Sequence, residues 1–344
     1  MINRMDELYM QRALELAQLG QGSVSPNPMV GCVVVHNNRI IGEGWHQKYG
    51  QAHAEVNALN AVAERHLLPE ATVYVTLEPC SHFGKTPPCA DRLVNEGVKR
   101  VVICNDDPNP LVAGRGIQKL RDAGIAVTTG VLAAQGRLIN RRFFTYFEKN
   151  RPYIILKWAE TADGFLAGPD YQPLHISNAL SRRLLHKWRT QEDAFLVGTN
   201  TVRYDNPQLN VRLWQGKDPV RVTLDRTLSL PRNAHFFDDS QSTLIYSTSE
   251  RQATSTTEWV VPEEWTLSSV VKDLRKRSIQ SLVVEGGTRL LESFINENLW
   301  DEIRIFRSPN RIHEGIVAPA FSAKPASHEF LLKDELTVYF QDSF

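Results

Sequence analysis

The sequence alternates short apolar strand patterns with amphipathic helical patterns, and this alternation limits the folds that the chain can adopt. Strand patterns occupy residues 29–35, 40–45, 71–77, 98–104 and 125–129. Helical periodicity is found at 53–66, 91–97 and 116–123, and an amphipathic helix precedes all of these at 1–20. The pair Asn37-Asn38 is typical of a hairpin turn between the first two strands. This order predicts an α/β layered domain.

The second half repeats the alternation and predicts a second α/β domain. A polar stretch at 148–152 ends in proline, so we expect domains at 1–148 and 149–344. A chain of 344 residues is long enough for two cores. The expected strands are 153–158, 194–198, 220–224, 243–246 and 281–285, and the expected helices are 181–189, 268–276 and 288–297. Residues 247–262 are polar and predict a surface loop with a short edge strand.

Composition excludes several classes of protein. The 39 basic side chains balance the 39 acidic ones, which gives no support for a surface that binds polyanions. The sequence contains no run of 18 apolar residues, so we expect no membrane span. The N-terminal helix lacks the apolar block of a signal peptide. Four cysteines do not make a disulfide framework. We therefore expect a cytoplasmic protein without membrane or nucleic-acid partners.

One group of residues has the composition of a catalytic zinc site. His53 and Glu55 begin a predicted helix, Cys80 follows a predicted strand, and Cys89 lies nine residues further on. One imidazole and two thiolates leave the fourth tetrahedral position open for water, as in catalytic zinc sites. Glu55 is placed to carry protons from that water to a substrate nitrogen. The pattern predicts one zinc ion per chain and a hydrolytic deaminase.

The spacing of the cysteines departs from the usual H-x-E and P-C-x-x-C signature of zinc deaminases. Eight residues, 81–88, separate Cys80 from Cys89 and form a loop by composition. Two other interpretations stay open on the residues alone. In the first, the two cysteines are buried free thiols. In the second, His82 competes with them as a ligand.

Longer motifs surround these residues and continue into the second half. They are SPNPMVGC at 25–32, HAE at 53–55, EPCSHFGKTPPC at 78–89, DDPNP at 106–110, GRGI at 114–117, KWAETADG at 157–164, TVRYDNPQLNVR at 201–212 and VEGG at 284–287. Together they resemble the RibD family of bifunctional riboflavin biosynthesis proteins over nearly the whole chain.

This resemblance implies a fold, two reactions and two cofactors. The fold class is α/β, with an N-terminal cytidine-deaminase-like α/β/α domain and a C-terminal dihydrofolate-reductase-like α/β domain. The first domain would deaminate 2,5-diamino-6-(5-phosphoribosylamino)pyrimidin-4(3H)-one with zinc. The second would reduce the ribosyl side chain to ribityl with NADPH. The resemblance also implies a small-molecule substrate and a homo-oligomer, either a dimer or a tetramer.

The resemblance assigns a role to each matching position. The zinc ligands would be His53, Cys80 and Cys89, and the catalytic proton carrier would be Glu55. Substrate contacts would come from Asn27, His82 and Lys85 in the first half, and from Lys157, Arg189, Leu209, Arg212 and Glu285 in the second. Cofactor contacts would come from Glu160, His175, Thr201, Asp205, Gly287, Thr288 and Arg289. Gly286 to Thr288 opens a predicted helix after a strand, where free backbone N–H groups suit a phosphate.

The second half departs from the family pattern at two places. Thr161-Ala-Asp-Gly164 stands where the family usually has Ser-Leu-Asp-Gly. His175 stands where the family usually has a tryptophan that lines the cofactor site, which bears on cofactor affinity. Two alternatives to this bifunctional enzyme remain. One is a nucleic-acid base deaminase with a non-catalytic C-terminal binding module, and the other is an inactive zinc-stabilised scaffold.

Overall fold

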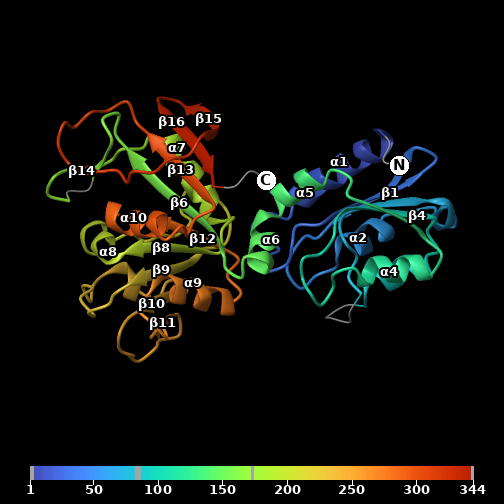
Figure 1. Ribbon diagram of the computed structural model, residues 1–344, viewed down its shortest axis with the longest axis horizontal. Helices are drawn as coiled ribbons and strands as arrows, with labels where there is room; N and C mark the ends of the chain where they lie inside the picture. Colours follow the sequence, from blue (N-terminus) through green and yellow to red (C-terminus); the bar gives the residue numbers. More distant parts are fainter. Residues whose placement is uncertain (1–3, 82–86, 172–173, 342–344) are drawn as a thin grey trace. The chain divides into compact units, whose positions relative to one another are not determined.

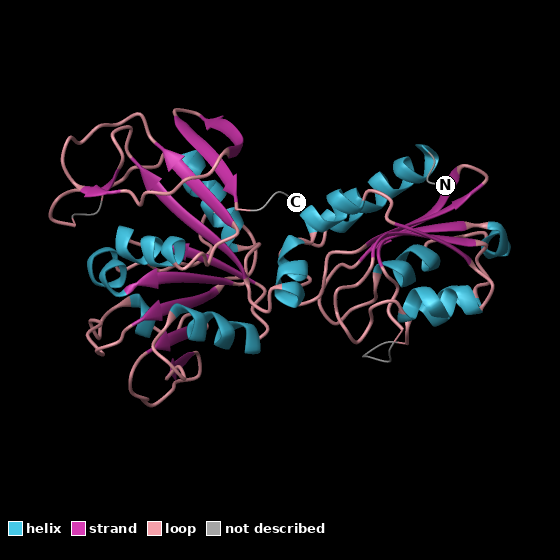
Figure 2. Cartoon of the chain, viewed as in Figure 1, coloured by secondary structure: helices cyan, strands magenta, loops and turns pink. Residues whose placement is uncertain are grey.

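The computed structural model describes residues 4–81, 87–171 and 174–341. The chain folds into two compact units, of which one ends at Lys149 and the other begins at Asn150. Figure 1 shows both units with their elements labelled, and Figure 2 shows that each contains a sheet flanked by helices. None of the helices in the described part of the chain combines the length and the hydrophobicity that crossing a membrane requires.

Within its described residues, the first unit contains a five-stranded mixed sheet. Its strands are β1 (Gly31–His36), β2 (Arg39–Trp45), β3 (Thr72–Leu77), β4 (Arg100–Asn105) and β5 (Ala126–Thr129). They lie in the order β2-β1-β3-β4-β5. β1 is antiparallel to both of its neighbours, whereas β3, β4 and β5 are parallel. The carboxyl ends of β3 and β4 therefore meet at one edge of the sheet.

Helices cover both faces of this sheet, because alternate strand residues point to opposite sides. Val33 packs with Met10 and Leu14 of helix α1, whereas Val34 packs with Ala58 and Leu93 on the other face. In Figure 1, α1 and α2 accordingly lie on opposite sides of the sheet. The helices are α1 (Arg4–Gln18), α2 (Ala54–Asn60), α3 (Cys89–Asn95), α4 (Arg115–Asp122), α5 (Ala133–Ile139) and α6 (Arg141–Glu148). The predicted α/β/α layering of this half is confirmed.

Two features of the first unit differ from the sequence-based expectation. The helix predicted at 53–66 ends at Asn60, and a 3-10 helix, η1 (Arg65–Glu70), follows it. The side chain of Arg65 donates to the carbonyl oxygen of Leu59 at 3.1 Å, so a side chain satisfies one of the last carbonyl groups of α2. Helices α5 and α6 were not predicted. Phe143 and Phe144 of α6 pack with Leu77 at the end of β3.

The second unit contains a nine-stranded sheet in the described residues. Its strands are β6 (Tyr153–Glu160), β8 (Ala194–Gly198), β9 (Val220–Leu224), β10 (Thr243–Tyr246), β11 (Thr257–Val260), β12 (Ser281–Glu285), β13 (Glu302–Arg307), β15 (Pro325–Leu331) and β16 (Asp334–Phe340). They lie in the order β11-β10-β9-β8-β12-β6-β13-β16-β15. The first seven are parallel, and the last two are antiparallel. β7 (Phe165–Ala167) and β14 (Ile316–Val317) form a separate small ribbon.

Each face of this second sheet carries its own hydrophobic cluster. Leu156 and Val284 pack with residues of α9 and α10 on one face. Ile155 and Val283 pack with residues of α7 and α8 on the other. The helices are α7 (Ala179–Arg189), α8 (Thr199–Asp205), α9 (Leu267–Lys276) and α10 (Thr288–Asn296), with a 3-10 turn, η2 (His235–Phe237). The expected loop at 247–262 does contain a short edge strand, β11.

Candidate active sites

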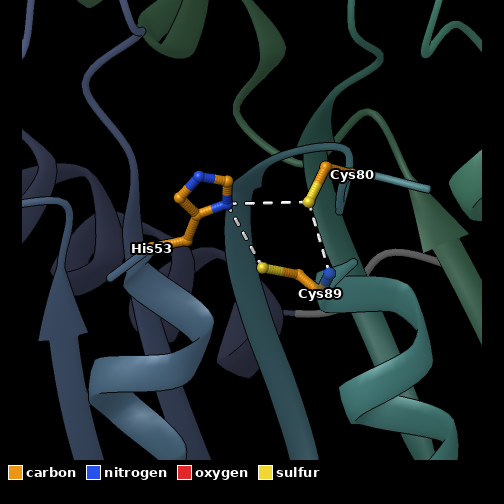
Figure 3. A group of neighbouring side chains, drawn as sticks. All are labelled: His53, Cys80 and Cys89. Atoms are coloured by element: carbon orange, nitrogen blue, oxygen red, sulfur yellow. Dashed lines mark hydrogen bonds between the residues drawn. The ribbon is translucent and has the colours of Figure 1, made fainter. Parts of the chain in front are cut away.

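Three side chains from separate elements converge in the first unit. His53 is the residue before α2, Cys80 follows β3 by three residues, and Cys89 is the first residue of α3. Their candidate ligand atoms all lie within 4.8 Å of one another. Figure 3 shows the imidazole and both sulfurs pointing at one point. The fold therefore brings together His53 and Cys80, which are 27 residues apart in the sequence, and Cys80 and Cys89, which are 9 residues apart.

The distances in this group suit a tetrahedral zinc ion. The Nδ1 atom of His53 lies 3.6 Å from the Sγ of Cys80 and 3.4 Å from the Sγ of Cys89. Zinc bonds of about 2.0 Å to nitrogen and about 2.3 Å to sulfur place tetrahedral neighbours roughly 3.5 Å apart. Hydrogen bonds from Cys89 are the main cause that lowers the pKa of the Cys80 thiol to about 4. The residues therefore fit the metal both in donor chemistry and in spacing.

A buried carboxyl group lies on the first turn of α2 beside this group. Glu55 is only 3 % exposed. Burial raises the pKa of Glu55 to about 7, and the charge of Cys80 acts in the same direction. A carboxyl group with such a pKa both takes up and releases protons near neutral pH. Glu55 is thus a group suited to proton transfer at the expected metal position.

Asn27 belongs to this site through a histidine that sequence reasoning missed. The Nδ2 atom of Asn27 lies 3.1 Å from Nε2 of the buried His46. The ring of His46 meets the ring of His53 edge-on, with centroids 5.5 Å apart. His46 follows a glycine-rich strand with no signal of its own, so only the return of β2 beside α2 brings it to the metal ligands.

Glu78 is a second residue of this site without a predicted role. Its buried carboxylate accepts the backbone N–H groups of Gly114 and Gly116 at 2.9 Å each, and two longer bonds come from Asp107 and Ile117. Glu78 thereby ties the segment 107–117 to the strand that leads to Cys80. The Glu-Pro-Cys motif was a signal for this residue, but nothing local indicated its partners. The predicted contacts His82 and Lys85 lie outside the described residues.

The second unit has a cavity of about 880 Å³ at the carboxyl ends of its central parallel strands. Lys157 of β6, Gly198 of β8 and Glu285 of β12 line it. Ligands of open α/β sheets bind at this edge. Most of the predicted reductase residues lie on its wall, namely Lys157, His175, Arg189, Thr201, Asp205, Leu209, Glu285, Gly287, Thr288 and Arg289.

Three charged side chains meet in this cavity. The Nζ atom of Lys157 lies 3.6 Å from one oxygen of Glu285, and a guanidinium nitrogen of Arg189 lies 3.7 Å from the other. Burial lowers the pKa of Lys157, and Glu285 opposes this shift. Gly287 precedes α10, a helix of nine residues, and lines the same cavity. The size of the cavity and the N-terminus of α10 fit a dinucleotide whose phosphates accept hydrogen bonds from backbone N–H groups.

Two predicted residues are not among the cavity-lining residues of the described chain. The carboxylate of Glu160 is buried and accepts hydrogen bonds from Nε1 of Trp158 and Nε of Arg307, both at 2.8 Å. Arg307 is its cross-strand neighbour on β13, so strand register decides this contact. The side chain of Arg212 is exposed and donates to Asn210 at 2.9 Å.

The segment that carries Arg212 is nonetheless attached to α7 near the cavity. The backbone N–H of Arg212 donates to Nδ1 of His186 at 3.2 Å, and Arg189 donates to the carbonyl oxygen of Asn210 at 3.0 Å. Burial, followed by the charges of Arg189 and Arg212, lowers the pKa of His186 to about 4. Sequence reasoning did not identify His186, which is one of several polar residues on a helix with a basic face.

The Thr161-Ala-Asp-Gly164 departure keeps the contacts of its aspartate. The hydroxyl of Thr161 donates to Asp163 at 2.6 Å, as a serine hydroxyl also can. The same carboxylate accepts the backbone N–H groups of Ile312 and His313 at 3.1 and 2.9 Å. The motif therefore orders a loop, and its hydroxyl survives the change from serine to threonine.

Comparison with known proteins assigns both halves to described families. Residues 3–105 match the family model described as the cytidine and deoxycytidylate deaminase zinc-binding region, and residues 152–312 match the RibD C-terminal domain. The riboflavin biosynthesis protein RibD of Aquifex aeolicus is 42% identical over 323 residues, which cover 92% of this chain and 90% of that protein. The RibD protein of Escherichia coli is 37% identical and covers 88% of each chain.

Solved structures agree with these sequence matches. A diaminohydroxyphosphoribosylaminopyrimidine deaminase/5-amino-6-(5-phosphoribosylamino)uracil reductase from Thermotoga maritima is similar with a TM-score of 0.90 and 36% identity over 98% of both chains. RibD of Acinetobacter baumannii is similar with a TM-score of 0.91 and 35% identity over 98% of this chain and 99% of that one.

Proposed function

The chain belongs to the RibD family of bifunctional riboflavin biosynthesis enzymes, and we propose the substrate and the residue roles that its two sites support. It is a deaminase and a reductase. The match of the second half to a reductase domain removes the alternative of a non-catalytic binding module. The proposed substrate is 2,5-diamino-6-(5-phosphoribosylamino)pyrimidin-4(3H)-one, which the name of the Thermotoga maritima relative supports.

We propose that residues 1–148 carry the deaminase. His53, Cys80 and Cys89 hold one zinc ion, whose chemistry when bound is to activate a water for attack at neutral pH. Glu55 would carry one proton from the attacking water to the ring nitrogen, and a second proton, from the hydroxyl group that the attack creates, to the departing ammonia. Asn27 contacts the pyrimidine, and His82 and Lys85 of the loop after Cys80 contact its ring or phosphate. The observation that carries this proposal is the convergence of three ligand atoms beside a buried carboxyl group.

We propose that residues 149–344 carry an NADPH-dependent reductase. Bound NADPH supplies hydride for the reduction of the ribosyl side chain. Lys157, Arg189, Leu209 and Glu285 hold the substrate, because they line the cavity and include the three charged side chains that meet there. Thr201, Asp205, Gly287, Thr288, Arg289 and His175 contact the cofactor. Glu160 is proposed to contact the cofactor and Arg212 the substrate, as the resemblance implies, although neither is among the described residues that line the cavity.

One experiment tests both activities. The purified chain is incubated with the diaminopyrimidine phosphate, with and without NADPH, and the products are read by mass. Deamination adds one mass unit, and reduction adds two more only when NADPH is present. A product unchanged in mass after incubation with zinc would reject the proposed substrate.

We also propose an oligomeric state and a cellular compartment for this chain. All four cysteines are free, which supports a reducing cytoplasmic compartment. Phe330 of the edge strand β15 is 70 % exposed, and Leu332 in the turn after this strand is 72 % exposed, which supports a homo-oligomer. Light scattering of the purified chain tests the assembly, and a mass equal to the monomer would reject it.

A further inference from the structure

His46 is a buried histidine that connects Asn27 to the metal ligands. It follows β2 directly and is 2 % exposed. Its Nδ1 atom lies 3.1 Å from the carbonyl oxygen of Ala52, and its Nε2 atom lies 3.1 Å from Nδ2 of Asn27. Its ring also contacts the ring of His53, so the ring and both of its nitrogens are engaged within the site.

These partners determine which nitrogen of His46 carries the proton. The carbonyl oxygen of Ala52 only accepts hydrogen bonds, so Nδ1 must be the donor. The atom that faces Nε2 is the amide Nδ2 of Asn27, which only donates hydrogen bonds. A neutral imidazole has one donor and one acceptor, and Nε2 is therefore the acceptor.

The tautomer of His46 in turn determines how the amide of Asn27 lies. An accepting Nε2 atom requires the Nδ2 atom of Asn27 to donate to it, which directs Oδ1 to the other side of the amide. We propose that His46 is a positioning residue that holds Asn27 so that Oδ1 accepts an N–H group of the aminopyrimidine. This inference rests on the proposed function, in which Asn27 contacts the substrate.

Neighbouring hydrogen bonds indicate that His46 acts on the side chain of Asn27 and not on the backbone around it. The backbone near Asn27 is held independently, because the amide of Asn140 exchanges two hydrogen bonds of 2.8 Å with the backbone of Met29. The carbonyl oxygen of Ala52 has a second donor in Nδ2 of Asn57, at 3.4 Å. Loss of His46 therefore frees the side-chain amide of Asn27 more than it disturbs the backbone on either side.

Each of two substitutions preserves one hydrogen bond of His46 and removes the other. The amide of glutamine reaches the position of Nε2, so His46→Gln keeps an acceptor for Asn27 and loses the bond to Ala52. The amide of asparagine reaches the position of Nδ1, so His46→Asn keeps the bond to Ala52 and loses the acceptor. Losing one neutral hydrogen bond to the substrate corresponds to about tenfold in affinity.

The test measures ammonia release and zinc content for both variants, with His66→Gln at an exposed histidine as the matched control. We expect one zinc per chain throughout. We expect kcat/KM within about threefold of the unsubstituted enzyme for His46→Gln, and a loss of about tenfold, mainly through KM, for His46→Asn. Equal losses in both variants, no loss in either, or a loss confined to His46→Gln would overturn the proposal.

A second readout does not depend on turnover. Nitrogen-15 NMR of the zinc-loaded enzyme, with the His46 signals identified by their absence in His46→Gln, should show the proton on Nδ1. A proton on Nε2, or on both nitrogens, would overturn the inference even in an active enzyme. Failure of the unsubstituted enzyme to release ammonia would instead reject the proposed function and leave this measurement interpretable.

Discussion

The backbone N–H of Cys89 donates a hydrogen bond to the sulfur of Cys80 at 3.2 Å. One proposed metal ligand thus stabilises the thiolate of the other through its own peptide group, because a hydrogen bond to a thiolate favours the charged form. The bond also closes the segment between the two cysteines at its ends. This contact explains how two cysteines with eight residues between them can both bind one metal ion, although zinc deaminases usually have two residues between these cysteines.

Replacing Cys89 should separate the two activities. In Cys89→Ala the backbone donor remains but one of three ligands is lost, so we expect zinc to dissociate and ammonia release to fall to background. NADPH oxidation with the deaminated substrate should stay within about twofold, since domains with separate cores keep separate sites. Zinc is measured by atomic absorption, and Cys104→Ala, at a buried cysteine that is not part of the group, is the control. Full zinc content in Cys89→Ala would contradict the ligand set.

Replacing Glu55 should stop deamination without removing the metal. Glu55→Gln preserves size but removes the proton carrier, and general acid–base catalysis contributes about 10²–10⁴-fold. We expect ammonia release to fall by at least about 10²-fold with zinc content unchanged. Glu15→Gln, at an exposed glutamate of α1, serves as the control. Normal turnover in Glu55→Gln would refute the assigned role.

Replacing Asp205 should affect only the reductase. Asp205 lines the cavity, and burial raises the pKa of its carboxyl group. We expect Asp205→Ala to weaken NADPH binding by about tenfold or more, because the cofactor loses a hydrogen bond that it donates to a carboxylate acceptor. Fluorescence titration with NADPH measures this, and ammonia release is the internal control. A parallel fall of both activities would contradict the division into two catalytic domains.

Replacing Glu285 should leave two buried cations without their shared anion. In Glu285→Gln the charges of Lys157 and Arg189 remain 3.6–3.7 Å from a neutral amide. We expect unfolding to be easier by roughly 1–3 kcal/mol and kcat/KM of the reductase to fall by about tenfold or more. Denaturant unfolding and NADPH oxidation measure the two effects. Unchanged reductase kinetics would show that these three side chains do not hold the substrate.

Stability should decrease as the pH falls below the ordinary pKa of histidine, in part because of His186. The pKa of His186 is about 4 in the folded chain and about 6.5 when unfolded. Between these values the unfolded chain binds a proton that the folded chain does not, so acid favours unfolding. His186→Asn places an acceptor where Nδ1 lies but does not titrate. We expect its unfolding free energy to depend less on pH between about 4 and 6.5 than that of the unsubstituted chain. Identical pH dependence would contradict the assignment.

Local sequence patterns were sufficient to predict two α/β domains and the metal chemistry. Alternating strand and helix patterns depend on local spacing, and His53, Cys80 and Cys89 have few other uses together beside Glu55. The order of the nine strands was not accessible in this way, because neighbours such as β12 and β6 are more than a hundred residues apart in the chain. Strand pairing over such separations depends on the packing of the whole sheet.

The partners of the polar groups depend on the three-dimensional arrangement of the chain and could not be predicted from local sequence. Glu160 and Glu285 are both acidic residues at strand ends, yet the register with Arg307 occupies the first, and the second faces Lys157 and Arg189 in the cavity. His46 and Glu78 gained their roles from partners that lie 19 and 36 residues away. A hydrogen bond depends on distance and direction in space, which local sequence periodicity does not encode.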